Sequence, residues 1–589
     1  MRKIVLLVAI SLTLPLSASA ATNGNTTIPD EQYVNSGVAP GKGYIGYSSA
    51  NGFELRMSAS HHVQYRLDSI YRGSNPPDLP QKILSFKECR GNGSNCVNRL
   101  GKAEEDYRNK YLAVLSGCRT ETQTNCVQGL SATTADGVKH VGKMLLEEFK
   151  GESLQNYVGN PAIDLPDGNS SFIVDIPGAP HGAGTKYLVV AELTSEMNEG
   201  DAKFAPARMH VGIFAVTITN GSYPNRTFTP SDYPDSQHPY GALWKPSPYG
   251  KISAYSESCV QHNTSACAVP QKLPLDTSFS LTLKLNVPVV GWFHGRVTDA
   301  SLKITSTSTN DRIYEVTAKP VLVPMVSQWK RHDEITQNLR DFYEKQPQPL
   351  GGTGDVEKSF FSTIGSNQWS LRRDQTDFNE TGMKEFLLWL ENMNDKAVAT
   401  PSQWSLRSID SGDNKCFSSV NKVVGIVQTN ATMYLSGPPS FNSVEGSLDY
   451  KVAGPHFQSD GSLNQGTYDL LIKKDVAQCI YGFDKAPTKA TVSVLSADGK
   501  ETAQTVTLSE SDEWVKLRAA GFTYSAPVLR VKLEREQIAA APVATTNSAV
   551  NLPVPTKKIL KVITCMKGTK TRYLEGKKPK CPKGYKLIT

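Results

Sequence analysis

The pattern that most constrains the fold is an alternation of apolar and polar residues with a period of two. Its clearest example comprises Phe279, Leu281, Leu283, Leu285 and Val287. Successive residues of a strand face opposite sides of a sheet, so this pattern predicts a strand with one buried face. Other strand-like runs occur at 171–176, 187–193, 211–219 and repeatedly across 423–533. Many short strands between turns predict a mainly β chain built as multidomain antiparallel β-sandwiches.

Two segments have helical periodicity instead. Ile335, Leu339 and Phe342 would share one face of a helix over 333–345, and a second helix is predicted over 381–394 with Thr381 as its N-cap. Because both lie between strand-rich regions, they predict a short helical connector.

These patterns divide the chain of 589 residues into six parts. The predicted parts are a signal peptide (1–20), an N-terminal β region of one or two sandwiches (41–330), a helical connector (331–400), a C-terminal β-sandwich (401–535), a linker (536–556) and a basic module (557–589).

The N-terminus has the features of a secretory signal peptide. Arg2 and Lys3 precede an apolar run over 4–16, and Ala18-Ser19-Ala20 forms a cleavage site before Ala21. The apolar run is shorter than the roughly 20 residues that a membrane-spanning helix needs. The mature protein is therefore predicted to be secreted, extracellular or associated with the cell surface, and not to span a membrane after cleavage.

The ten cysteines predict disulfides, because export leads to an oxidising environment. Sequence neighbours suggest five bridges, namely Cys89–Cys96, Cys118–Cys126, Cys259–Cys267, Cys416–Cys479 and Cys565–Cys581. Metal binding is the alternative, but no pair has the CxxC spacing of a zinc site, so no metal is expected.

Positive charge is concentrated at the C-terminus. The basic residues there are Lys557, Lys558, Lys561, Lys567, Lys570, Arg572, Lys577, Lys578, Lys580, Lys583 and Lys586. Glu575 is the only acid among them, so 557–589 carries +10 while 21–556 carries −5. A segment this short buries too little apolar surface to fold without a covalent cross-link, and a Cys565–Cys581 disulfide would supply one. The module is predicted to bind an anionic cell-envelope polymer; alternatively, its lysines only keep the tail soluble. Nucleic acid is not an expected partner, because no recognition motif accompanies the charge.

This tail resembles the C-terminal segment of a group of secreted, largely uncharacterised actinobacterial surface proteins. The resemblance rests on Ile563-Thr564-Cys565, Lys567-Gly568, Cys581-Pro582 and Gly584-Tyr585-Lys586, in an ITCxKG…CPxGYK pattern. It covers about thirty residues and implies export and surface association, but no activity.

The sequence contains no motif for a catalytic or cofactor site, so no cofactor is expected and catalytic residues are unknown. His181, in a Pro/Gly loop after Asp175, could belong to a site, although an exposed turn histidine is the favoured interpretation. Trp292-Phe293-His294 and Tyr481-Gly482-Phe483 could bind sugar, although a core position is favoured. We therefore expect an exported binding or structural protein whose body recognises a glycan or protein. The alternative is a secreted hydrolase acting on polysaccharide or another polymer.

Overall fold

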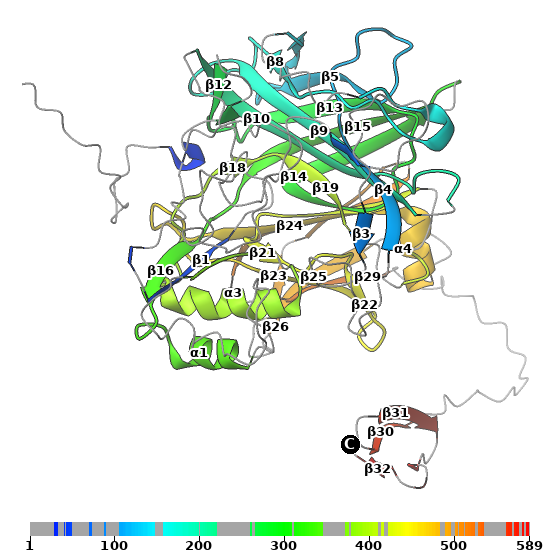
Figure 1. Cartoon of the computed structure of the whole chain (residues 1–589). Coiled ribbons are helices and arrows are strands. Elements are labelled where there is room, and N and C mark those ends of the chain that lie inside the picture. The colour runs from blue at the N-terminus through cyan, green and yellow to red at the C-terminus, as the bar shows by residue number, and fades with distance from the viewer. Residues whose placement is uncertain are drawn as a thin grey trace, which may run out of the picture. The chain divides into compact units, whose positions relative to one another are not determined.

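The computed structural model forms two compact units, Met1–Glu536 and Gln537–Thr589, which are described separately (Figure 1). It describes residues 29–32, 40–41, 43–49, 70–72, 87–89, 105–147, 157–198, 201–220, 260–261, 266–308, 311–345, 371–375, 378–409, 414–417, 422–482, 489–495, 501–504, 506–511, 513–524, 528–534, 561–567, 570–576, 580–581, 583 and 585–587. The predicted signal peptide and the whole predicted linker lie outside these residues.

The first unit is built around one long sheet, here called the shared sheet. Its strands, in spatial order, are β2 (Ile70–Arg72), β4 (Glu105–Val114), β9 (Lys186–Asn198), β10 (Arg208–Asn220), β19 (Ser405–Ile409), β14 (Gly291–Ser306), β20 (Val423–Thr429), β24 (Gln465–Lys473), β28 (Trp514–Thr523) and β27 (Val506–Ser511). Neighbours are antiparallel, except that β14 and β20 run parallel. The shared sheet joins strands from the predicted N-terminal region and the predicted C-terminal sandwich.

Short strands extend the shared sheet at its margins. They are β3 (Lys87–Cys89) on β4, β8 (Phe172–Asp175) on β9, β7 (Lys143–Leu145) on β8, β12 (Ala266–Pro270) on the end of β10, and β11 (Val260–Gln261) on β12.

A second sheet covers one face of the shared sheet. Its order is β6 (Lys139–Val141), β5 (Cys126–Thr133), β13 (Ser278–Leu285), β15 (Arg312–Leu322) and the second half of β14, with β18 (Ser402–Gln403) paired to the end of β15. β14 therefore belongs to both sheets, since its first six residues pair with β19 and β20 and the rest pairs with β15.

A third sheet covers the opposite face. It contains β21 (Met433–Tyr434), β22 (Ser440–Asn442), β23 (Ser447–Ala453), β29 (Val528–Glu534), β25 (Lys489–Leu495) and β26 (Glu501–Gln504). In Figure 1, β24 lies between β13 and β15 on one side and β23 and β25 on the other. The resulting three layers of β-sheet confirm the mainly β prediction.

Alternation along the central strands explains the three layers. Phe293 and Ile426 lie in the hydrophobic core shared with the second sheet, whereas their neighbours Trp292 and Val427 lie in the core shared with the third. All four side chains are fully buried. Because β20 is buried on both faces, it reads as the continuous apolar run VVGIV and not as an alternating strand.

A small sheet and two helices form a separate layer with its own core. The sheet is β16 (Ser327–Arg331), β1 (Tyr44–Ser48) and β17 (Leu371–Asp374), and the helices are α1 (Gln337–Glu344) and α3 (Glu380–Asn392). Tyr47 stacks on Trp389 in this core. Both predicted helices are present, but the N-cap of α3 is Asn379, whose side chain accepts from Gly382 N, and not Thr381.

The described part of the first unit also contains three short helical segments. The 3₁₀ helices are η1 (Asp30–Gln32) and η3 (Pro161–Ile163), and the α-helix is α4 (Lys474–Tyr481), directly after β24. α4 buries Val476, Ala477 and Ile480, a pattern too short to be recognised in the sequence. Among the described residues, no helix combines the length and apolar character needed to cross a membrane.

The second unit contains β30 (Lys561–Lys567), β31 (Lys570–Gly576) and β32 (Lys586–Leu587). β30 is the central strand of an antiparallel sheet and pairs with β31 on one side and β32 on the other.

Candidate functional site

The small sheet of the second unit brings basic positions together along its backbone. Lys567 pairs with Lys570 across the β30–β31 turn, and Cys565 pairs with both Arg572 and Leu587. Cys581 is disulfide-bonded, as expected for a staple in this module. Lys557, Lys558, Lys577 and Lys578 lie outside the described residues.

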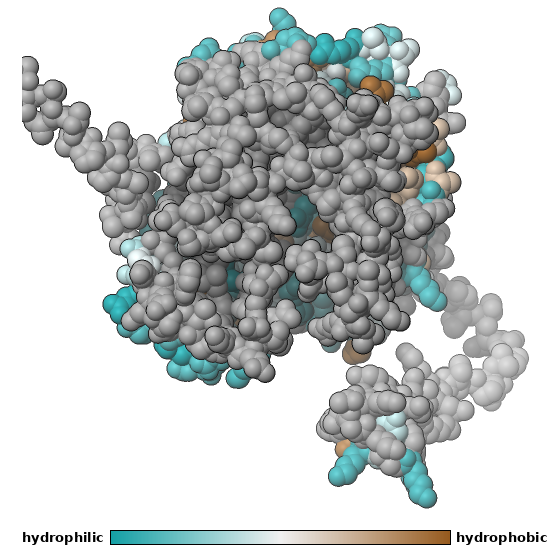
Figure 2. Space-filling model, in the orientation of Figure 1, coloured by the Kyte–Doolittle hydropathy of each residue, from teal (hydrophilic) through white to brown (hydrophobic). Residues whose placement is uncertain are grey.

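Three lysines of the second unit have described side chains, and all three are exposed. They are Lys580, Lys583 and Lys586, and none of them forms an ion pair with a described carboxylate. Figure 2 shows hydrophilic side chains projecting from this unit. At these positions the positive charge faces solvent without an ion pair to any described carboxylate, and an exposed charge of this kind can attract a polyanion.

Two of the five expected disulfides are seen in the first unit. Cys118–Cys126 closes a short loop that ends at the start of β5, and Cys416–Cys479 ties a segment after β19 to α4. Among the cysteines whose side chains the structure describes, none is a free thiol. The side chains of Cys89, Cys96, Cys259, Cys267 and Cys565 lie outside this set.

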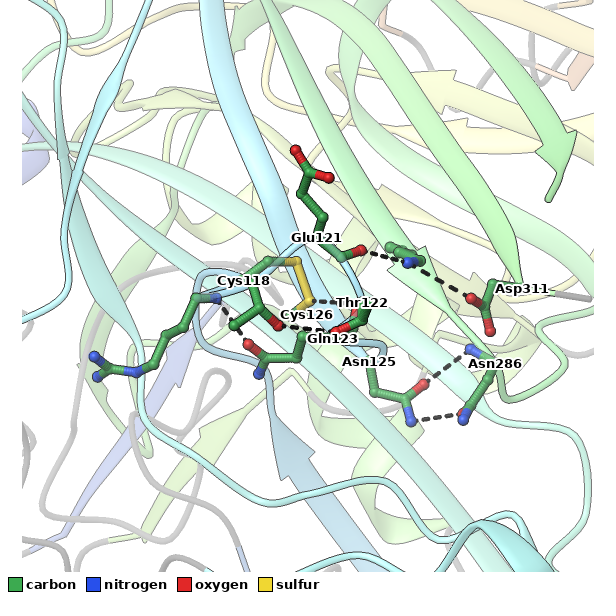
Figure 3. The surroundings of a disulfide bond; sticks show 11 residues. Cys118, Glu121, Thr122, Gln123, Asn125, Cys126, Asn286 and Asp311 are labelled. Atoms are coloured by element: carbon green, nitrogen blue, oxygen red, sulfur yellow. Dashed lines mark hydrogen bonds and ion pairs between the residues drawn. A yellow bond between two sulfur atoms is a disulfide. The ribbon is translucent and has the colours of Figure 1, made fainter. Parts of the chain in front are cut away.

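The Cys118–Cys126 loop is held by contacts besides its disulfide (Figure 3). Gln123 Oε1 accepts from Arg119 N at 2.7 Å, and Asn125 Nδ2 donates to Asn286 Oδ1 at 2.6 Å. Asn125 also has a left-handed φ of 53°, which asparagine tolerates better than most residues. The loop therefore presents the exposed residues 119–122 on a backbone with little remaining freedom.

A buried lysine anchors this loop to the second sheet. Lys284 Nζ donates to the Glu121 carbonyl at 2.8 Å and lies 3.6 Å from Asp311 Oδ2 (Figure 3). Lys284 is 8% exposed although it lies on the outer face of β13, opposite to Leu283 and Leu285. The stapled loop thus folds over the outer face of the second sheet and covers this ion pair.

His181 and Asp175 do not form a site together. His181 Nε2 lies 3.1 Å from the Lys186 carbonyl, and its ring packs edge-on against Tyr187. Asp175 instead accepts from Thr185 Oγ1 at 2.5 Å. His181 is 8% exposed, and burial lowers its pKa, so it is a neutral part of the loop structure and not the exposed turn histidine that we expected.

The aromatic segments are also structural. Trp292, Phe293 and His294 are fully buried, as the favoured interpretation expected, so none of them can stack on a sugar at the surface. Tyr481 is partly buried and donates to the Val531 carbonyl at 3.1 Å, while Phe483 lies outside the described residues.

A row of polar residues crosses the centre of the shared sheet, and the sequence did not reveal it. Glu192, His210, Arg407 and His294 are direct neighbours on β9, β10, β19 and β14. Directly paired residues of neighbouring strands point to the same face, so this polar row faces the third sheet. His210 Nδ1 lies 3.4 Å from Glu192 Oε2.

Tyr434 of β21 covers this polar row. His294 stacks flat on its ring at 3.6 Å, and the guanidinium groups of Arg296 and Arg407 lie 4.8 Å and 5.5 Å from its centre. Arg296 is fully buried and donates to the carbonyls of Thr429, Ala431 and Thr432. These contacts join the shared sheet to the segment that leads into the third.

Burial shifts the pKa values of two members of this cluster, His294 and Arg296. Burial and the neighbouring charges of Arg296 and Arg407 hold the pKa of His294 well below its usual value, so its ring is neutral. Burial also lowers the pKa of Arg296 to about 10, which still leaves it charged at neutral pH. Because charged groups in a protein interior require hydrogen bonds, the cluster functions as a polar connection between layers.

A second buried polar group lies where β14 passes from the shared sheet to the second sheet. The pairing of β14 with β15 is interrupted between Thr298 and Ser301, and Asp299 in this bulge has a φ of 58°. Asp469 of β24 accepts from Asp299 N at 2.7 Å and Thr298 Oγ1 at 2.9 Å. It therefore holds the bulge in place.

Two basic residues of β28 complete this group. Lys516 Nζ donates to Asp299 Oδ1, and Arg518 Nε lies 3.8 Å from Asp469 Oδ1. Asp469 is 1% exposed, and burial raises its pKa despite the opposing effects of these hydrogen bonds and charges. An acid among apolar residues in the strand 466–472 was the one signal in the sequence that could have identified this site.

Among the described residues, no group of three histidines, cysteines or acids could hold a metal ion. Comparison with known proteins finds no family model, no curated protein and no solved structure that this chain matches.

Proposed function

We propose that this chain is an exported protein of the cell surface, in which the C-terminal basic unit binds an anionic envelope polymer and the β-sheet body has a binding or structural role. The observation that carries the proposal is the charge distribution along the chain. Residues 557–589 have a net charge of +10, whereas residues 21–556 have a net charge of −5. The basic segment lies within a compact unit of its own.

Electrostatic attraction is the expected basis of retention. Lys580, Lys583 and Lys586 are exposed, and their ammonium groups form no ion pair with the carboxylates that the structure describes. Lysine is a flexible point charge and suits a polymer without one fixed geometry. Interactions of this kind weaken with salt, since the Debye length falls from about 8 Å at 0.15 M to about 3 Å at 1 M.

Export is supported by the N-terminal sequence and by the disulfides Cys118–Cys126 and Cys416–Cys479, because such bonds persist mainly outside the cytosol. The body's binding role is supported by the stapled loop at 118–126. A loop that is already ordered loses less conformational entropy when it binds a partner. The partner of the body would be a glycan or a protein.

The test compares retention of three forms of the full chain on cells of the source. The first is wild type, and the second carries glutamate at three basic positions, namely Lys580, Lys583 and Lys586. The matched control carries glutamate at three exposed lysines of the body, namely Lys139, Lys303 and Lys396.

We expect the tail variant to appear in the medium and the control to stay on the cells. Washing with 1 M salt should release wild type and control alike. Retention of the tail variant together with resistance of wild type to salt would exclude electrostatic anchoring through this unit.

A further inference from the structure

The sheet of β16, β1 and β17 carries a tryptophan on the face that points away from its two helices. In β1, Ile45 and Tyr47 lie in the core formed with α1 and α3, so Gly46 between them faces the opposite side. Trp329 of β16 is the direct partner of Gly46. Directly paired residues share a face, so the indole also lies on the side away from the helices, which Figure 1 shows on one side of this sheet.

The contact with Gly46 determines how the indole is oriented. A Cβ on this glycine would lie 2.6 Å from Cε3, 2.7 Å from Cδ2 and 2.7 Å from Cζ3 of Trp329. Three adjacent ring atoms at nearly equal distances place that position over the ring face and not at the ring edge. Glycine weakens a strand interior and often marks a close approach to the backbone. One face of the indole therefore covers Gly46, and the other faces away from the sheet.

The outward side of Trp329 is partly open to solvent. The residue is half-buried, as expected for a ring with one covered face. Among the described residues, no aromatic ring stacks on Trp329 and no hydrogen bond uses its indole N–H. That N–H is also not one of the buried polar groups without a partner, so solvent reaches it. The indole thus presents an aromatic face and a hydrogen-bond donor to a ligand.

Two charged side chains lie beside this aromatic face. Arg331 follows Trp329 by two residues on the same face of β16, and its guanidinium donates to both carboxylate oxygens of Asp333, at 3.2 Å and 3.3 Å. Their side chains are 56% and 66% exposed. The pair therefore offers solvent both N–H donors and carboxylate acceptors in one geometry. An aromatic surface with a few fixed polar groups beside it is typical of a ligand site.

We propose that Trp329 is a stacking platform for a glycan of β-linked N-acetylglucosamine units, and that Arg331 and Asp333 bind the acetamide group. This assignment rests on the proposed binding role of the body and names the class of its partner. In a β-linked unit of this sugar all ring substituents are equatorial, so each ring face carries only axial C–H bonds. These slightly positive bonds complement the negative face of the indole. The acetamide C=O can accept from Arg331, and its N–H can donate to Asp333.

The test is calorimetric titration of the full chain with soluble hexamers of β-linked N-acetylglucosamine and of β-linked glucose. Both sugars are uncharged, so the basic C-terminal unit does not attract them, and failure here leaves the test of retention by charge unaffected. We expect the N-acetylglucosamine hexamer to bind even in about 1 M salt, because salt screens charges and not stacking. The glucose hexamer, which lacks the acetamide, should bind more weakly.

Absence of binding of the N-acetylglucosamine hexamer to wild type would overturn the proposal. Equal affinity for the glucose hexamer would overturn the assignment of Arg331 and Asp333 to the acetamide.

Three variants assign the roles. Trp329→Ala should weaken binding of the N-acetylglucosamine hexamer about ten-fold or more, through loss of the stacking contact. Arg331→Ala should reduce the affinity for this hexamer towards that for the glucose hexamer, and the exposure of Arg331 makes this variant the deciding one if Trp329→Ala does not fold. Phe457→Ala removes a ring that is 39% exposed outside this sheet and should bind like wild type. Wild-type affinity in a folded Trp329→Ala protein, checked by its melting temperature, would show that the indole only covers Gly46 and would overturn the proposal.

Discussion

The two disulfides of the body should differ in their contribution to stability, because they close loops of very different length. Cys416–Cys479 joins residues 63 apart, whereas Cys118–Cys126 joins residues 8 apart. In the chain-entropy model, closing the longer loop destabilises the unfolded chain by about 4 kcal/mol and the shorter by about 2.5 kcal/mol. The perturbation is replacement of both cysteines of one bridge by alanine.

The longer loop contains β20 and β24 of the shared sheet and β23 of the third sheet. Urea unfolding followed by tryptophan fluorescence suits the comparison. Trp292 is fully buried and packs edge-on against Phe417 at 5.1 Å, next to Cys416. The free energy of unfolding should fall by about 1.5 kcal/mol more in the Cys416/Cys479 variant than in the Cys118/Cys126 variant.

Equal losses, or a greater loss from the short bridge, would refute the reasoning. Such a result would mean that native contacts of the stapled loop, and not the entropy of the unfolded chain, decide what a disulfide contributes here. Chemical reduction of wild type provides the control, because it opens both bridges without removing side-chain atoms from the folded protein.

Three further predictions concern buried groups. Arg373→Met should reduce the free energy of unfolding by about 3–5 kcal/mol in denaturant titration, since it leaves Glu385 as a buried charge without its bidentate partner. Glu385→Gln, which retains an acceptor, should cost less. Gly425→Ala should lower the melting temperature, because a Cβ would lie 2.4 Å from Trp292 Cζ3 and 2.7 Å from the Leu471 carbonyl; an unchanged melting temperature would contradict this packing. The stability of wild type should rise relative to that of Asp469→Asn as pH falls. Burial raises the pKa of Asp469 in the folded protein, so its protonation stabilises the fold fully below pH 3.8, and this contribution is lost as pH rises through the folded pKa. Parallel profiles of unfolding free energy against pH for the two proteins would contradict this prediction.

Secondary structure could be predicted from the sequence where local periodicity was strong. The alternation over 279–287 corresponds to β13, and the helical spacing of Ile335, Leu339 and Phe342 corresponds to α1 and the turn before it. The charge concentration in the tail is also a property of the sequence alone. Short amphipathic elements such as α4 were missed because eight residues contain too few repeats.

Candidate sites were harder to predict, because their residues become neighbours only through strand pairing. His210, Arg407 and His294 come from three separate segments, and no spacing in the sequence connects them. His181 stood out because of its Pro/Gly loop, yet the structure uses that loop to bury its ring.

By itself, the sequence indicated several of the strands, showed that one end of the chain is strongly basic, and provided ten cysteines that could form bridges. Only the tertiary structure decided that β14 pairs parallel with β20, that the shared sheet borders one hydrophobic core on each face, and that Asp469 and Lys516 both contact Asp299. The physical reason is that alternation shows which face of a strand is apolar, whereas the choice of its neighbours depends on long-range packing.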